Sequence, residues 1–329
     1  MKIVFFDVQE WEKDSFQAKF PDAVLVEAPI NFKNVSAYTD AEIISSMTFS
    51  VLDSQVLSQL PNLKHIASRS TGYDYIDLSF AKNKNISVSY IPEYGSNTVA
   101  EHAFALILAL TRKVYQAINQ MKDFNFDHTK LTGVDIYGKT LGIIGLGKIG
   151  INVLRIANSF GMKVLVFTKT QREDLRQKFD FEYVPLDELL RESDIITVHV
   201  PLNPETKHMI NKNNILSLKK GSYLINTARG EIIETGAIIL GLEKGILEGV
   251  GLDVLEKEKE LTEEVSVLAS KLHAEDFKNL MMNHVLINHP KVLITPHNAF
   301  NSKEALQRII DETIENIEGF LKGSPKNLV

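Results

Sequence analysis

Cysteine is absent from the 329 residues of this chain, and tryptophan occurs once. Without thiols the protein has no disulfide framework, no thiolate metal site and no cysteine nucleophile. The composition is also not that of a disordered chain, because charged residues make up 24% and apolar residues 44% of the sequence, as in folded proteins. We therefore expect an ordinary globular protein whose chemistry uses other side chains and no metal.

An excess of basic residues and long apolar runs are lacking too. Lys and Arg number 36 against 42 Asp and Glu, a net charge of −6, so broad binding of nucleic acid is not expected. The longest apolar run, Ala103 to Leu110, is well short of the roughly 20 residues that span a bilayer. Met1 to Phe6 holds too few apolar residues before Asp7 for a signal peptide. These absences predict a cytoplasmic protein with neither nucleic-acid nor membrane partners.

The first part of the chain alternates short β-rich runs with helical patterns, which is typical of parallel strands joined by crossover helices. The expected strands are Ile3 to Phe6, Ala23 to Val26, Ile43 to Ser46, His65 to Ser68 and Ile86 to Tyr90. Ser96 to Gln120 predicts one long helix, because its apolar positions continue without Gly or Pro. The polar residues Met121 to Gly138 predict a loop after it.

A second alternation predicts six strands with helices between them, the pattern of a dinucleotide-binding domain. These strands are Thr140 to Gly145, Lys163 to Phe167, Ile195 to His199, Tyr223 to Asn226, Gly249 to Leu252 and Val292 to Thr295. Glu256 to Asn288 interrupts the series with a charged start and a helical middle. An amphipathic helix, Lys303 to Lys322, follows, and we place it back on the first domain.

The predicted fold class is therefore α/β, with two doubly wound parallel-sheet domains. A chain of 329 residues has room for two cores. Residues 98–298 form a Rossmann nucleotide-binding domain. Residues 1–97 together with 299–329 form a discontinuous, flavodoxin-like substrate-binding domain.

A glycine fingerprint follows the first strand of the second series. Gly145, Gly147 and Gly150 have the Gly-x-Gly-x-x-Gly spacing at the point where a strand passes into a helix. Gly145 would make the tight turn, Gly147 would let the backbone approach a pyrophosphate, and Gly150 would let helix and strand pack closely. The flanking strand, helix and strand supply the context that this motif requires, so we predict NAD binding.

The acidic residue that usually accompanies this fingerprint is missing. It would lie at the tip of the next strand and bind the adenosine ribose, but Thr168 occupies that position, with Lys169 and Arg172 just beyond. A hydroxyl beside a lysine can accept a ribose 2′-phosphate that a carboxylate would repel, which indicates NADP as an alternative cofactor. In the other interpretation Lys169 and Arg172 are solvated turn residues and NAD binds with a weaker ribose contact.

Three ionisable residues stand at or near the ends of predicted strands of the second domain: Arg229, Glu258 and His297. Ligands of such sheets bind outside the carboxyl ends of the strands, so all three can face one crevice. Histidine titrates near neutrality and can donate a proton, a carboxylate beside it favours imidazolium, and the guanidinium fork suits an oxo acid. This set can reduce a 2-oxo acid once a hydride donor is bound.

The order of these motifs resembles the D-isomer-specific 2-hydroxyacid dehydrogenase family over essentially the whole chain. Asn226-Thr-Ala-Arg-Gly, Gly251-Leu-Asp-Val with a Glu five residues after the Asp, and Thr295-Pro-His follow the glycine fingerprint. The resemblance implies catalytic roles for Arg229, Glu258 and His297, and it places Asp253 near the nicotinamide. Because Glu258 lies in the charged run Glu256-Lys-Glu-Lys-Glu260, Glu256 and Glu260 stay open as register alternatives.

Two further sets of residues are expected to contact ligands. The predicted cofactor contacts are Gly145, Gly147, Lys148, Ile149, Gly150, Thr168, Lys169, His199, Val200, Pro201, Thr206, Thr227, Ala228 and Asp253. In the first domain Thr71 and Gly72 match a loop whose backbone N–H groups bind the substrate carboxylate in the family. Tyr94 and Phe49 are expected to line the substrate pocket beside Arg229 and His297. We interpret His102 as a buried structural histidine and His199 as part of the cofactor wall.

The pattern is most similar to D-lactate dehydrogenases, through the loop Ser68-Arg-Ser-Thr-Gly-Tyr-Asp and the long insertion between Glu258 and His297. Phe300 stands where many relatives have a tyrosine, which leaves the substrate open among small 2-oxo and 2-hydroxy acids. Glyoxylate or hydroxypyruvate reduction is one alternative, and a corepressor-like protein that senses the cofactor on this fold is another. The resemblance also implies a homodimer, with Ser96 to Met121 and Met121 to Gly138 as contacts.

Overall fold

The computed structural model describes residues 1–258 and 274–329. The chain divides into two compact units, one made of Met1–Gly95 and Asn301–Val329 and the other of Ser96–Phe300. We call them unit 1 and unit 2. Each of the two boundaries between the units lies two residues from its predicted position.

Unit 1 is built on a five-stranded parallel sheet with the order β2-β1-β3-β4-β5, the order of flavodoxin-like folds. The strands are β1 Ile3–Phe5, β2 Val24–Leu25, β3 Ile43–Ser46, β4 His65–Ser68 and β5 Ser87–Ser89. The helices are α1 Glu10–Lys19, α2 Ser54–Leu57, α3 Leu78–Asn83 and α13 Lys303–Leu321, with the 3-10 turn η1 Val35–Tyr38. All five predicted strands and the last helix are present.

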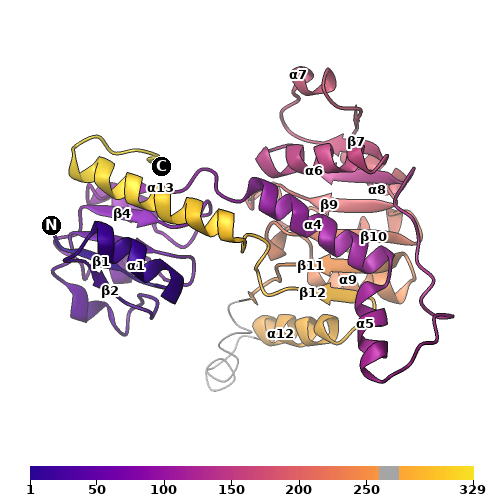
Figure 1. Cartoon of the computed structure of the whole chain (residues 1–329), viewed down its shortest axis with the longest axis horizontal. Coiled ribbons are helices and arrows are strands. Elements are labelled where there is room, and N and C mark those ends of the chain that lie inside the picture. Colours follow the sequence, from indigo (N-terminus) through magenta and orange to yellow (C-terminus); the bar gives the residue numbers. More distant parts are fainter. Residues whose placement is uncertain (259–273) are drawn as a thin grey trace. The chain divides into compact units, whose positions relative to one another are not determined.

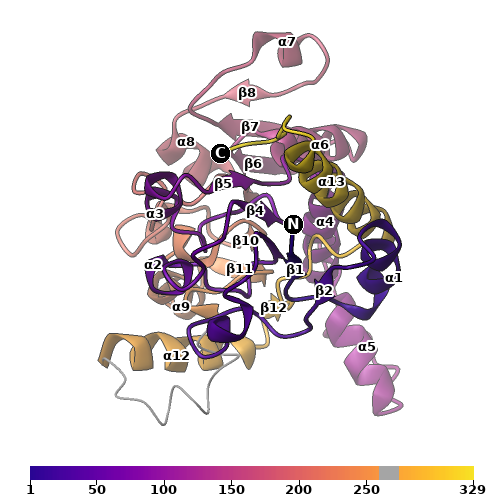
Figure 2. The same cartoon turned by 90° about the vertical axis from the view of Figure 1, so that its left-hand side faces the viewer.

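Helices cover both faces of this sheet. Successive side chains of a strand point to opposite faces, so the apolar residues of each strand enter two cores. In β1, Val4 belongs to the core under α2 and α3, whereas Phe5 belongs to the core under α1 and α13. Figure 2 shows α2 and α3 on one side of the strands and α1 and α13 on the other. The sheet is therefore buried on both sides, as parallel sheets are.

The last helix, α13, returns to unit 1, where it completes the second core (Figure 1). Ile310 and Ile317 pack with Phe5 and Ile43, and the ring of Phe320 stacks on His65 of β4 with centroids 4.4 Å apart. Unit 1 is thus discontinuous in sequence.

Unit 2 holds a seven-stranded parallel sheet with the order β12-β11-β10-β9-β6-β7-β8. Its strands are β6 Thr140–Ile144, β7 Lys163–Phe167, β8 Glu182–Tyr183, β9 Ile195–Val198, β10 Ser222–Asn226, β11 Leu247–Leu252 and β12 Val292–Ile294. Its helices are α4 Ser96–Thr111, α5 Val114–Lys122, α6 Lys148–Ser159, α7 Glu173–Arg176, α8 Leu186–Glu192, α9 Thr235–Glu243 and α12 Ala274–Ile287, with 3-10 turns η2 Ile215–Ser217 and η3 Gly230–Ile232. The order is that of a Rossmann domain with one added strand, so the predicted fold class is confirmed.

The prediction of six strands was wrong by one. The additional strand, β8, has only two residues, Glu182 and Tyr183, and pairs with β7 at the edge of the sheet. Two residues are too few to show the alternation by which strands are recognised in a sequence.

The prediction of a single helix over Ser96 to Gln120 was also wrong, because the chain breaks into α4 and α5 at Lys113. That residue has a left-handed backbone with φ of 52°. The Thr111 carbonyl, which would continue the helix, instead accepts a hydrogen bond from Val134 N–H at 2.8 Å. Gly133 allows this approach, since a Cβ there would lie 2.3 Å from the Thr111 oxygen. A later segment of the chain therefore ends the helix.

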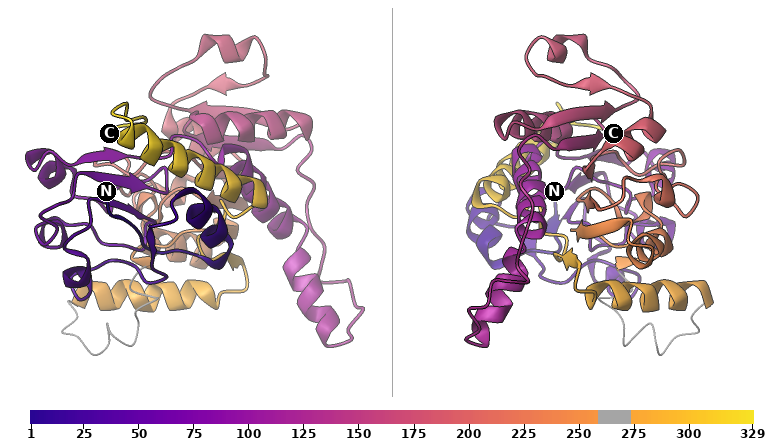
Figure 3. Two further views of the ribbon diagram at one scale, coloured as in Figure 1. Left: turned by 60° about the vertical axis from the view of Figure 1, so that its left-hand side comes forward. Right: turned by 90° about the vertical axis from the view of Figure 1, so that its right-hand side faces the viewer.

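The position of α5 differs from that of the other helices of unit 2. Figure 3 shows α5 extending beyond the body of the unit, and the chain that follows it runs back toward β6. None of the described side chains of α5 is buried. In the described ranges, no helix combines the length and apolar character needed to cross a bilayer.

Candidate active site

The glycine turn after β6 has the close contacts that its spacing predicts. Gly145 has φ of +101°, and a Cβ on it would lie 2.7 Å from the His199 carbonyl oxygen. A Cβ on Gly150 would lie 2.1 Å from the Gly145 oxygen, so a side chain at either position would push α6 away from the sheet. Gly147 is exposed, and a Cβ on it would meet no atom within 4 Å, which leaves its surface open to a ligand.

The N-terminus of α6 begins directly at this turn. Its first hydrogen bond joins Ile151 N–H to the Gly147 carbonyl at 2.9 Å, so the N–H groups of Ile149 and Gly150 have no acceptor inside the helix. Ile149 is half-buried and Lys148 is exposed beside it. A helix N-terminus of this kind favours an anion such as a pyrophosphate.

Two buried polar atoms without partners lie at the ends of adjacent strands. Within residues 1–258 and 274–329, His199 Nδ1 after β9 and Thr227 Oγ1 after β10 have no hydrogen-bond partner. The two strands pair with Val198 opposite Asn226, so these residues are neighbours along the sheet edge. His199 Nε2 bonds Thr197 Oγ1 at 2.8 Å, and burial lowers the pKa of His199 to about 3. Unsatisfied buried groups at a Rossmann switch point fit a dinucleotide that supplies their missing partners.

The remaining loops around the expected cofactor site are closed by short hydrogen bonds. Thr206 Oγ1 donates to the Pro201 carbonyl at 2.6 Å, which closes the loop after β9. The Val200 side chain lies against the Gly145 turn, and Ala228 N–H donates to Asn226 Oδ1 at 3.0 Å. These residues therefore border the turn or the ends of β9 and β10.

No carboxylate occupies the tip of β7. Thr168 Oγ1 lies 3.5 Å from the Leu146 nitrogen. Lys169 is exposed and its Nζ is 3.2 Å from Glu205 Oε2, while Arg172 forms a two-point contact with Asp174 at 3.0 and 2.7 Å. Exposed pairs of this type are worth little energy and can exchange partners, so both predicted interpretations of the cofactor remain compatible with the geometry.

Arg229 follows β10 and is half-buried, with Nη1 donating to the Ala228 carbonyl at 2.8 Å. The next residue, Gly230, packs against the backbone of Leu255 and Glu256. A Cβ on Gly230 would lie 2.1 Å from the Leu255 carbonyl carbon. The glycine therefore brings the Arg229 loop into contact with the loop that carries Glu258.

Glu258 and His297 meet at the carboxyl edge of the sheet. Glu258 Oε1 lies 2.6 Å from His297 Nδ1, and the two side chains are 37% and 39% exposed. His297 Nε2 has no hydrogen-bond partner in the described ranges. His297 itself has a left-handed backbone with φ of 49°, which is uncommon for a residue other than glycine.

Asp253 connects β11 to the loop that holds His297. Its buried carboxylate accepts hydrogen bonds from Thr295 Oγ1 at 2.5 Å, Asn298 N–H at 3.0 Å and Ala299 N–H at 2.8 Å. Its carbonyl accepts the His297 N–H at 2.9 Å. The Asp253 side chain is therefore already engaged in shaping the loop.

The interpretation of His102 as a buried histidine was wrong. Its side chain is 21% exposed, and Nε2 lies 3.0 Å from Thr295 Oγ1 and 3.6 Å from Asp253 Oδ1. The apolar neighbours of His102 on α4 suggested burial, but these contacts place its ring at the edge of the polar network below His297.

In unit 1, the loop after β4 carries Thr71 and Gly72. Thr71 Oγ1 donates to the Ile91 carbonyl at 2.8 Å. Across the two described ranges, the backbone N–H groups of Thr71 and Gly72 donate no hydrogen bond. Phe49 is 66% exposed on the loop after β3, and Tyr94 is half-buried, its carbonyl accepting from Arg308 Nε at 2.5 Å.

Of the register alternatives to Glu258, Glu256 is engaged elsewhere, with His208 and Thr235, and Glu260 lies outside the described residues, as does part of the long insertion. Sequence reasoning missed His208 and Thr235, which have no motif around them. It also missed Gly230 as a packing residue, although the Asn-Thr-Ala-Arg-Gly motif contains it. In the described ranges no group of three or more His, Asp or Glu side chains could hold a metal ion.

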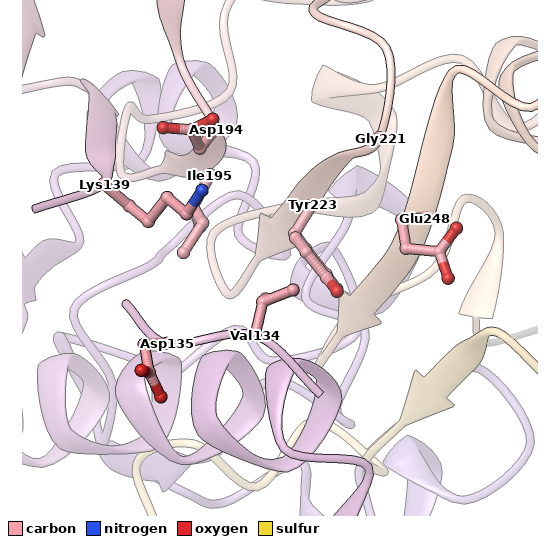
Figure 4. A pocket seen from close by; sticks show the side chains of 8 residues that line it. All are labelled: Val134, Asp135, Lys139, Asp194, Ile195, Gly221, Tyr223 and Glu248. Atoms are coloured by element: carbon pink, nitrogen blue, oxygen red, sulfur yellow. The ribbon is translucent and has the colours of Figure 1, made fainter. Parts of the chain in front are cut away.

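A small pocket lies at the other end of the strands of the same sheet. Lys139, Asp194 and Glu248 precede or begin β6, β9 and β11, and they line it together with Tyr223 and Val134 (Figure 4). Asp194 and Glu248 are paired with Lys219 and Lys291. Because this pocket is at the amino ends of the strands, it is separate from the residues described above.

Comparisons with known proteins agree with this arrangement. A family model described as the NAD binding domain of D-isomer specific 2-hydroxyacid dehydrogenase matches residues 104–299. The chain is 33% identical to a glyoxylate reductase of Korarchaeum cryptofilum over 92% of this chain and 87% of the relative. It is 32% identical to the D-lactate dehydrogenase of Escherichia coli, with both chains fully covered. A solved D-lactate dehydrogenase of Aquifex aeolicus, complexed with NAD and lactic acid, superposes with a TM-score of 0.89 at 36% identity, covering 100% of this chain and 99% of that one.

Proposed function

Because this chain belongs to the D-isomer-specific 2-hydroxyacid dehydrogenase family, we propose that it interconverts a small 2-oxo acid and its D-2-hydroxy acid, with a D-lactate dehydrogenase-like activity. The observation that carries the proposal is the pair Glu258 and His297, joined at 2.6 Å through Nδ1. That contact leaves the other ring nitrogen, Nε2, to face a substrate. The proposed catalytic residues are Arg229, Glu258 and His297.

NAD(H), when bound, supplies or accepts the hydride. In the reducing direction His297 Nε2 donates the proton to the carbonyl oxygen, and the products are the hydroxy acid and a neutral imidazole. Glu258 holds the ring through its contact with Nδ1. Arg229 binds the oxo acid through its planar fork. Proton and hydride together account for the two hydrogens that the substrate gains.

The proposed cofactor contacts follow from the fit described above. The first turn of α6 would hold the pyrophosphate, and Gly147 would lie against it. His199 Nδ1 and Thr227 Oγ1 would gain their missing partners, while Thr168 and Lys169 would lie at the adenosine end. In unit 1 we propose that the N–H groups of Thr71 and Gly72 bind the substrate carboxylate, with Tyr94 and Phe49 as apolar contacts.

The test is oxidation of NADH by pyruvate, glyoxylate, hydroxypyruvate and 2-oxoisocaproate, followed by absorbance. We expect turnover with at least one of them and the D-isomer as product, identified by chiral chromatography. Tight NADH binding without turnover of any 2-oxo acid would contradict the proposal and favour a cofactor-sensing protein. An L-product would contradict the assigned stereochemistry.

We propose NAD as the cofactor, with NADP accepted through Thr168 and Lys169. The observation is the lack of a carboxylate at the tip of β7, where Lys169 pairs with the exposed Glu205. Comparison of kcat/KM for NADH and NADPH tests it. A Lys169→Glu variant should lower kcat/KM for NADPH more than for NADH. A large NADH preference that this variant leaves unchanged would show that Lys169 is a solvated turn residue.

A second copy of this chain is the proposed protein partner. The arm formed by α5 and residues 121–138 exposes large apolar side chains: Tyr115 at 54%, Ile118 at 55%, Phe124 at 88%, Phe126 at 79% and Tyr137 at 79%. Such a concentration is rare on monomers. Light scattering should give twice the 37.0 kDa of one chain, and a Phe126→Asp variant should lower that mass. A monomeric wild-type chain would contradict the proposal.

A further inference from the structure

Glu256, two residues before Glu258, has a buried carboxylate that is fully engaged. Its side chain is 8% exposed. Oε1 lies 2.6 Å from His208 Nε2, and Oε2 accepts hydrogen bonds from both N–H and Oγ1 of Thr235, each at 2.6 Å. A buried carboxylate needs such partners to offset the cost of desolvation. Thr235 begins α9 and His208 lies in the chain before η2, so one side chain connects three segments.

The backbone around Glu256 is equally constrained. Asn283 Nδ2, on α12, donates to the Glu256 carbonyl at 2.8 Å. On another side, the α-carbon of Gly230 approaches so closely that a Cβ there would lie 2.1 to 2.3 Å from Leu255 C, Leu255 O and Glu256 N. The Leu255–Glu256 peptide therefore packs between α12 and the Arg229 loop.

The segment Leu255-Glu256 contacts both sides of the proposed catalytic set. Leu255 N–H donates to Glu258 Oε2 at 3.3 Å, while Glu258 Oε1 contacts His297. The peptide between Leu255 and Glu256 packs against Gly230, the residue next to Arg229. We infer that Glu256 is a positioning residue, whose contacts with Thr235 and His208 hold this segment so that Glu258 reaches His297 and Arg229 stays in place.

The inference rests on the proposed function and predicts a specific consequence for the proton donor. When Glu256 loses its contacts, the loop gains freedom and Glu258 spends less time against His297. The contact of Glu258 Oε1 with His297 Nδ1 orients the ring, so a weakened contact should lower kcat and move the NMR signal of the His297 Nδ1 proton toward that of an imidazole without a carboxylate partner. A residue that only stabilises the fold would leave this signal unchanged.

The experiment compares Glu256→Gln with a matched control, Glu248→Gln. Glu248 is a surface carboxylate paired with Lys291 at the other edge of the sheet. We expect Glu256→Gln to lower kcat on the order of 10-fold, as small misplacements of catalytic groups do, with NADH affinity within about twofold of wild type. Its His297 Nδ1 proton signal should move in the same direction as that of Glu258→Gln, whereas Glu248→Gln should match wild type in both respects.

Three further variants keep the inference testable if Glu256→Gln folds poorly. Thr235→Val removes the Oγ1 contact and keeps the N–H contact. His208→Gln keeps a side-chain donor that His208→Ala removes, so the former should retain more activity. Folded Glu256→Gln protein with wild-type kcat and an unshifted His297 Nδ1 proton signal overturns the inference.

NMR spectroscopy of the His297 ring, in wild type and in Glu256→Gln, separates this inference from the proposed function. The signal of the Nδ1 proton should move upfield in the variant, because its contact with Glu258 weakens, whether or not any 2-oxo acid is turned over. An unchanged signal overturns the inference even in an active enzyme. A shifted signal in a chain without turnover supports the positioning role and contradicts the proposed function alone.

Discussion

Each unit has a carboxylate paired with a basic side chain, and the two pairs differ in burial and in chemistry. In unit 1, Glu12 Oε1 lies 3.1 Å from Arg69 Nε, and the two side chains are 1% and 0% exposed. In unit 2, Glu258 and His297 are more than a third exposed. Arginine never releases its proton in proteins, whereas histidine titrates near neutrality. The first pair can hold structure but cannot exchange a proton, and the second can do both.

The surroundings of the buried pair show what it holds. Arg69 Nη2 donates to the carbonyls of Phe6 and Asp7 at 2.6 and 3.1 Å. The Asp7 carboxylate in turn accepts from Met47 N–H at 2.9 Å and Ser50 Oγ at 2.7 Å. Burial raises the pKa of Glu12, and the nearby charge of Arg69 opposes that rise. The network ties the ends of β1, β3 and β4 together beneath the Thr71 loop.

The largest effect is expected from a substitution that breaks the pair of Glu258 and His297. His297→Asn should lower kcat by about 10²- to 10⁴-fold, because general acid catalysis has this size. NADH affinity and the melting temperature should stay close to wild type, since the ring is partly exposed. Steady-state kinetics, fluorescence titration with NADH and calorimetry measure the three quantities. A variant with wild-type kcat would remove the contrast between the two pairs.

Breaking the buried pair should act on stability instead. Arg69→Met leaves the Glu12 carboxylate without its cation, which costs about 3–5 kcal/mol in the free energy of unfolding. Urea denaturation of the full chain measures it. In the double variant Glu12→Leu/Arg69→Met part of this loss should return, because no charge is left buried, although the Phe6 and Asp7 carbonyls still lack their donor. A double variant no more stable than the single one would mean that the ion pair contributes little.

A smaller effect on stability is expected from His65, a histidine of unit 1 that is buried, unlike His297. Burial lowers the pKa of His65 to about 4, and its ring nitrogens contact Ser87 and Ser89 at 2.8 and 3.0 Å. Between about pH 6.5 and 4 the unfolded chain binds a proton that the folded chain does not. Stability should therefore fall as the pH drops through that window, by roughly 3 kcal/mol at most from this residue.

Urea denaturation at several pH values checks this, with His65→Asn as the control. The unfolding free energy of the control should depend less steeply on pH than that of the wild type. The remaining slope belongs partly to His199, whose pKa burial also lowers. Identical slopes in wild type and control would exclude His65 as a source of acid sensitivity.

The strands that the sequence predicts are those with unbroken β-rich runs, such as Ile43–Ser46 and Lys163–Phe167, whose bounds match the structure. The glycine turn was readable because Gly145, Gly147 and Gly150 stand at a fixed spacing directly after an apolar strand. The break at Lys113 was not, because it depends on a hydrogen bond from Val134, far along the chain. The short strand β8 has too few residues to show a pattern.

The candidate site likewise contains residues that the sequence predicts and residues that it does not. Arg229, Glu258 and His297 stand in recognisable motifs, and the charged run around Glu258 left its register ambiguous. The contacts of Glu256 with Thr235 and His208 show how two glutamates with similar neighbours in the sequence serve different partners. His208 and Asn283 gave no signal, since only the folded chain brings them to Glu256.

The return of α13 to unit 1 has a consequence for the order in which the protein is made. Phe5, Ile43 and Ala67 belong to a core that Ile310 and Ile317 complete. During translation these partners leave the ribosome only after all of unit 2, so one face of the unit 1 sheet is covered by α1 alone at the time when unit 2 already has its whole sequence. A circularly permuted gene that begins at Ser96 would make unit 1 continuous and remove this delay.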